Sequence, residues 1–163
     1  MLALQSPMLQ RFHADWDVRR RGREFPARRD FDPCDLRYAL GYISLIDVLG
    51  DPPRFRFRLH GVGNAERVGI DMTGKLLEAM PDGRRYRLVS MHYSAVMKER
   101  EPVAQTRRVY AIDERAWNCE VLVLPLSSDG INIDMLMSCA AWADGGTSMR
   151  SAVPLAAGFQ GRS

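Results

Sequence analysis

Three histidines are the side chains in this sequence that could hold a metal or a haem. His92 follows Met91 at the edge of the apolar stripe of a predicted helix, where it could be an axial haem ligand or a border residue of the stripe. His60 occupies a strand position shared with arginines, and His13 lies on a predicted N-terminal helix. The sequence has no His-Glu-x-x-His motif and no Ser-His-Asp set in a recognisable order. We therefore expect no metal, no catalytic residue and no enzymatic activity, and the identity of any cofactor stays unknown.

The cysteines Cys34, Cys119 and Cys139 are odd in number and widely separated, and none belongs to a Cys-x-x-Cys pair. This spacing favours neither a disulfide framework nor a zinc site. A reducing compartment is the simplest setting for such cysteines, so we expect a cytoplasmic protein. No apolar run has the length needed to cross a bilayer, and we expect no membrane association.

Residues 54–69 combine an alternating stretch with a glycine-bounded one. Phe57 and Leu59 alternate with Arg58 and its neighbours, which predicts a strand with one buried face. The Gly61-x-Gly63 pair that follows resembles part of a dinucleotide-binding motif, but Glu66 stands where the third glycine would be. We interpret the glycines as a turn into a short helix.

The remaining patterns predict an α+β domain. Residues 42–49 and 54–60 read as two strands, and residues 102–112, 116–126 and 131–141 read as three more, with short helices between the two groups. Two strands, helices and three strands form one five-stranded antiparallel sheet with the helices on one face. A sheet curved over short helices leaves a hollow between the layers.

An amphipathic helix is predicted to precede this domain. Ser6 and Pro7 are typical of a helix start, and Leu9, Phe12 and Trp16 then recur at helical spacing. This stripe must cover either its own domain or the same helix of a second subunit, and we assign it to a homodimer interface.

A basic cluster follows the predicted helix. It could meet phosphate, an anionic surface or an acidic partner, or it could be a solvated, salt-bridged helix end. Aromatic residues for base stacking are sparse nearby, so nucleic acid binding is disfavoured. The cluster consists of Arg19, Arg20, Arg21, Arg23, Arg28 and Arg29.

Several motifs, taken in order, resemble a bacterial family of small, stand-alone PAS-like proteins. They are Trp16-x-x-Arg19, Asp30-Phe31-Asp32-Pro33, Leu45-x-Asp47-Val48, Phe55-Arg56-Phe57-Arg58-Leu59-x-Gly61, Gly69-x-Asp71-x-Thr73-Gly74 and Leu124-Pro125-Leu126-x-x-Asp129-Gly130. The resemblance implies a sensory or interaction module whose hollow can hold a small ligand of unspecified identity. Flavin-binding PAS domains that form a photo-adduct need a cysteine in the short helix, and residues 64–68 contain none.

The hollow and its rim can be assigned to particular residues. We expect the rim to be braced by Arg58, paired with Asp47 or Asp71, and to include His92. The expected ligand-binding lining is Phe57, Leu59, Met72, Leu77, Tyr93, Met97, Met135 and Met137.

Together these features predict residues 1–31 as helix and connector, 32–142 as a PAS-like domain and 143–163 as a flexible tail. The hypothesis for function is a sensory module that binds a small molecule and signals through a homodimer or a partner signalling protein. The alternative is a structural interaction module whose core is filled, because protein interiors are normally close-packed.

Overall fold

A five-stranded antiparallel sheet forms the centre of the computed structural model, which describes residues 2–143. The sheet has the strand order β2-β1-β5-β4-β3, so the two strands that precede the helices pair with the three that follow them. This is the predicted α+β arrangement. The strands are β1 (Ile43–Leu49), β2 (Arg54–Leu59), β3 (Val103–Tyr110), β4 (Ala116–Leu126) and β5 (Met135–Trp142).

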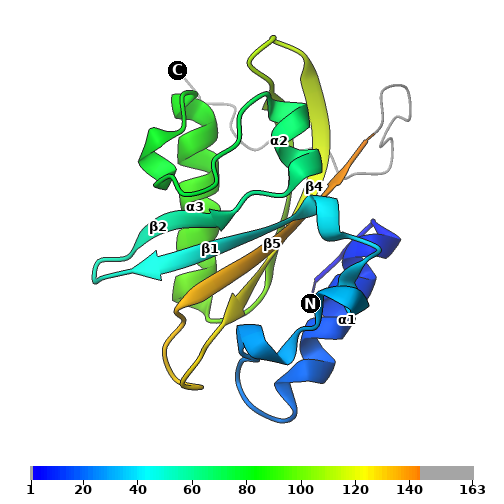
Figure 1. The fold of residues 1–163 in the computed structure, drawn as a ribbon, viewed down its shortest axis with the longest axis vertical. Helices are drawn as coiled ribbons and strands as arrows, with labels where there is room; N and C mark the ends of the chain where they lie inside the picture. Colours follow the sequence, from blue (N-terminus) through cyan, green and yellow to red (C-terminus); the bar gives the residue numbers. More distant parts are fainter. Residues whose placement is uncertain (1, 144–163) are drawn as a thin grey trace, which may run out of the picture.

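Helices cover both faces of the sheet. Helix α1 (Pro7–Arg20) lies on one face, and α2 (Val62–Val68) and α3 (Gly83–Glu99) lie on the other (Figure 1). Four short 3-10 turns complete the connections, at Arg28–Asp30, Pro33–Leu36, Leu40–Tyr42 and Leu77–Ala79. None of the helices in residues 2–143 is long and apolar enough to span a membrane.

The helix ends follow local sequence rules. The Ser6 hydroxyl accepts a hydrogen bond from the Leu9 amide and Pro7 occupies the first turn, as predicted for α1. Gly69 ends α2 in the left-handed conformation, at φ 81°. A Cβ at Gly61 would lie 2.6 Å from the Ile43 carbonyl oxygen, so the close approach of α2 to β1 requires glycine there.

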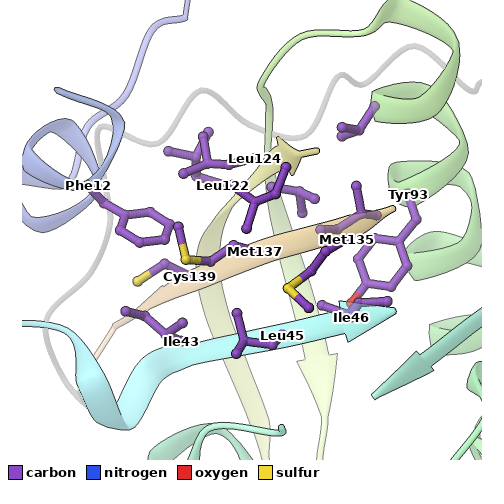
Figure 2. Packing of buried hydrophobic residues seen from close by; sticks show 14 of the residues in the cluster. Phe12, Ile43, Leu45, Ile46, Tyr93, Leu122, Leu124, Met135, Met137 and Cys139 are labelled. Atoms are coloured by element: carbon purple, nitrogen blue, oxygen red, sulfur yellow. The ribbon is translucent and has the colours of Figure 1, made fainter. Parts of the chain in front are cut away.

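The assignment of the α1 stripe to a dimer interface is wrong. Leu9, Phe12 and Trp16 are buried against the chain's own sheet, and the Trp16 Nε1–H donates to the Pro125 carbonyl at 2.8 Å. Figure 2 shows Phe12 beside Met137 and Cys139 of β5. The stripe therefore covers its own domain, which is the other reading that the sequence allowed.

A β-bulge overturns the predicted alternation at the end of β2. Leu45 pairs with Leu59 but Ile46 pairs with Phe57, so Arg58 is an extra residue in the ladder. After the bulge, each residue points to the side of the sheet opposite to the one that simple alternation predicts. Leu59, predicted to line the hollow, is 45% exposed, while His60, predicted to be exposed, is buried.

The tail expected at residues 143–163 falls, apart from Ala143, outside the described residues. The domain boundaries expected at residues 31 and 142 stay predictions.

Candidate functional site

A small cavity of about 60 Å³ lies between the sheet and the helices α2 and α3. Its apolar wall comes from β2, α3, the preceding turn and the three later strands, and is formed by Phe57, Met80, Val89, Val109, Val121 and Ala140. Its polar wall consists of Ser44, His60, Asn64, Arg85, Arg107 and Ser138. The hollow predicted from the element order therefore exists, and these six polar residues are among the fifteen that line it.

Arg107 is the most unusual residue of this wall. It lies on β3, is 6% exposed, and faces the cavity beside its cross-strand neighbour Cys119. Its guanidinium donates to His92 Nδ1 at 2.8 Å, and its Nε–H has no hydrogen-bond partner among residues 2–143. Burial lowers the pKa of Arg107, although a guanidinium stays charged in proteins. A buried charge with an unused donor therefore faces the cavity.

His92 holds this guanidinium in place. Its Nε2 lies 2.8 Å from the Val103 carbonyl oxygen and therefore carries the proton, which leaves Nδ1 to accept from Arg107. Burial and the charge of Arg107 lower the pKa of His92 to about 3. His92 is thus a fully buried neutral ring behind Arg107, and it is neither a rim residue nor free to bind a haem iron.

Asn64 connects α2 to the strands at one end of the cavity. Its Nδ2 donates to the Tyr42 carbonyl at 3.0 Å and to the Ser44 hydroxyl at 3.4 Å, and its Oδ1 accepts from Trp142 Nε1 at 2.8 Å. The Ser44 hydroxyl also accepts from the Gly61 amide. These bonds use the polar atoms of Asn64 and fix that wall.

His60 enters the cavity because of the β2 bulge. Its Nδ1 accepts a hydrogen bond from the Met72 amide at 3.1 Å, so its proton is on Nε2. Burial and Arg85 lower its pKa to about 4. Sequence reasoning missed His60 because period-2 alternation carries no signal for a bulge.

Two other titratable groups face the cavity in their neutral forms. Burial raises the pKa of the Cys119 thiol to about 11 and that of the Tyr93 hydroxyl to about 12. Neither group supplies a negative charge to the site at neutral pH.

The structure brings two of the predicted lining residues, Phe57 and Tyr93, to the cavity. Met72 and Leu77 are buried in the core but do not line the cavity, and Met97 lies at a separate depression near Asp134. Met72 and Leu77 therefore belong to the packed core, and Met97 packs against its margin.

Met135 and Met137 point to the wrong face of the sheet for ligand binding. Met137 pairs with Leu45 and Leu124, which belong to the face covered by α1. Because strand residues alternate, Ser138 and Ala140 of the same strand reach the cavity instead. The prediction placed the two methionines on the wrong one of the two alternating faces of β5.

Arg58 does not lie on the rim of the cavity. Its guanidinium pairs with Asp47 Oδ1 at 2.8 Å, and Arg56 pairs with Asp47 Oδ2 at 3.1 Å. Asp47 pairs with Met135 and so belongs to the α1 face. The predicted Arg58–Asp47 pair is present, but it braces the opposite side of the sheet.

The N-terminal basic cluster is occupied largely by internal contacts. Arg19 pairs with Asp15 and Asp35, Arg20 with Asp17, and Arg23 with Asp30. This is the salt-bridged helix end that the sequence allowed. Among residues 2–143 no group of three potential metal ligands is found.

Comparison with known proteins supports the architecture. A PAS domain family model matches residues 4–139. The crystal structure of the Rhodobacter sphaeroides LOV protein aligns with a TM-score of 0.52 and 12% identity, covering 88% of this chain and 71% of that one. The dark structure of the blue-light photoreceptor Aureochrome1 LOV aligns with a TM-score of 0.50 and 15% identity, covering 71% of this chain and 85% of that one. At these identities the solved structures show a common fold, and a search of curated proteins found no match.

Proposed function

The chain belongs to the PAS domain family, and on that premise we propose that it is a regulatory module that binds a small molecule in the cavity. The observation that carries this proposal is the polar wall, because a filled hydrophobic core has no use for so many inward polar side chains. The unused Nε–H of Arg107 supports it further. Ligand binding would supply the missing partner.

Strand β4 offers a route from the cavity to helix α1. Cys119 and Val121 line the cavity, while Glu120 between them faces the other side. The Glu120 carboxylate accepts from the backbone amides of Gln5 and Ser6 at 2.9 and 2.8 Å, at the start of α1. A ligand that prefers one position of β4 would shift the packing of α1, since a ligand moves an equilibrium only through differential affinity.

The output would pass to a partner signalling protein or to a second copy of the chain in a homodimer. The α1 stripe is already buried, so either contact must use another surface. Sedimentation of the purified chain, with and without ligand, would report the oligomeric state.

A flavin does not fit this cavity as it stands. Sites for cofactors and other small organic molecules usually measure about 300–1,000 Å³, several times the volume here. Helix α2 has no cysteine, and Cys119 lies on β4. We therefore favour a much smaller ligand.

Native mass spectrometry of the freshly purified chain tests the proposal. We expect a bound small molecule, and we expect hydrogen exchange in α1 to change when it is removed. The variant Ala140→Met should fill the cavity and abolish binding, whereas Ala104→Met, which faces the α1 side of the sheet, should not. If neither the native chain nor any added small molecule gives a bound species, the chain is better described as an interaction module with a filled core.

A further inference from the structure

We propose that the ligand of this cavity is a small carboxylate anion whose oxygens are bound by Arg107 and Arg85. This inference rests on the proposed function and specifies the class of ligand.

The cavity holds two positive charges without a counter-ion. Among residues 2–143, neither Arg107 nor Arg85 forms an ion pair with a carboxylate. Asp82, the acidic residue nearest to Arg85 along the chain, accepts the amides of Arg84 and Arg85 as the cap of α3. A buried charge is normally paired, because removing it from water is costly.

The groups that contact the arginines leave their charge in place. His92 accepts from Arg107 as a neutral ring, and burial keeps the Cys119 thiol protonated at neutral pH. Glu120 is adjacent to Cys119 in sequence, but its carboxylate lies on the other face of β4 and binds the start of α1. An anion in the cavity would therefore meet an uncompensated positive wall.

The size and the remaining wall favour a short carboxylate. The volume of about 60 Å³ is several times smaller than that of a usual site for an organic ligand, so a ligand has room for only a few non-hydrogen atoms. A guanidinium fork matches the two oxygens of a carboxylate. Val89, Val109 and Val121 also line the cavity and suit a methyl or ethyl group, which inorganic phosphate lacks.

An entrance of suitable charge lies between α3 and β3. Arg85 lines the cavity and also two neighbouring surface depressions. Asp82 lines both depressions as well, but one of them also carries Arg84, Arg107 and Arg108, so positive charge is in excess there. Positive charge at the mouth of a cleft concentrates anions there. Arg85 thus lies between the solvent-exposed depressions and the buried Arg107.

The first test uses the native chain after any co-purifying ligand has been removed. Thermal unfolding is followed with increasing sodium acetate or propionate at constant ionic strength, and compared with acetamide and propionamide, which have the same shape without the charge. We expect a saturable rise in Tm with the carboxylates and none with the amides. An equal response to the amides, or a response to inorganic phosphate alone, would overturn the carboxylate assignment while leaving a ligand-binding module.

The second test changes the arginines. Arg107→Met should weaken carboxylate binding at least about tenfold, as expected for loss of a buried charged donor, and Arg85→Met should weaken it less. Arg87→Met is the control, because Arg87 is an exposed arginine of α3 that lines neither the cavity nor the two depressions. Unchanged affinity in a folded Arg107→Met variant overturns the proposal. If that variant does not fold, the comparison of carboxylates with amides on the native chain still decides it.

Discussion

The two faces of the sheet differ in how they are packed. The face under α1 is packed with large apolar side chains, among them Phe12, Leu45, Leu124 and Met137, and Asp47, the acidic residue at its edge, is paired with two arginines. The face under α2 and α3 carries smaller side chains, buried polar groups and the cavity. One sheet therefore has a closed core on one side and a cavity with polar walls on the other, and substitutions on the two faces should have different consequences.

The largest expected effect comes from breaking the closed face. Phe12→Ala removes a fully buried ring from α1 and should lower the free energy of unfolding by about 3–5 kcal/mol. Denaturant unfolding measures this. Val18→Ala on the same helix is the control, because Val18 is 74% exposed and its loss should cost little. Equal, small effects would mean that α1 does not cover the sheet in solution.

A smaller loss is expected where the two faces are connected. Glu120→Gln keeps the shape of the side chain but leaves one oxygen to serve two backbone amides, so the free energy of unfolding should fall by about 1–3 kcal/mol. Hydrogen exchange at the start of α1 should also become faster. Glu66→Gln on the exposed side of α2 provides the matched control. Unchanged exchange in the Glu120 variant would argue against β4 as the route from cavity to helix.

The sequence predicted the helices and strands better than it predicted which of their side chains point towards the cavity. Strand lengths, turn residues and the helix stripes are local patterns, and they were sufficient for the α+β class and the five-stranded sheet. The lining of the cavity depends on which alternate residues of each strand point towards it. Local patterns do not determine this on a sheet that is buried on both faces. One extra residue at Arg58 moved His60 into the cavity and Leu59 out of it.

Arg107 shows a second limit of sequence reasoning. On β3 it follows Thr106 and precedes Arg108, and nothing in that run of polar residues distinguishes the buried arginine from the exposed one. The distinction arises from His92, which lies fifteen positions earlier on α3 and holds the guanidinium. The contact between α3 and β3, which are separated in the sequence, is therefore what distinguishes Arg107 from Arg108.

The polar face should also make stability depend on pH. The pKa of His92 is about 3 and that of His60 about 4 in the folded chain, against an ordinary value of 6.5. Below pH 6.5 the unfolded chain binds protons that the folded chain does not, so the free energy of unfolding should fall as pH falls towards 4.

The variant His92→Gln removes one of these two titrating groups. Glutamine can donate to the Val103 carbonyl and accept from Arg107, so the fold should be kept while the titrating group is lost. Denaturant unfolding between about pH 6 and pH 5 should show a slope reduced by about 1.2 kcal/mol per pH unit relative to the native chain. His13→Gln should reduce the slope less, because His13 is only partly buried and its pKa is lowered by a weaker burial effect. An unchanged slope in the His92 variant would show that this ring is protonated in the folded chain.

The smallest effect is expected at Arg58, and it sharpens the contrast between the faces. Asp47 is almost fully buried and is paired with both Arg56 and Arg58, while the two arginine side chains are about half exposed. Loss of one partner leaves the other in place, so Arg58→Ala should cost less than about 1 kcal/mol in denaturant unfolding. It should also leave the carboxylate response unchanged, because Arg58 contacts the side of the sheet opposite the cavity. Loss of that response in a folded Arg58→Ala chain would place the ligand near the β2 edge and contradict the proposed binding in the cavity on the opposite face.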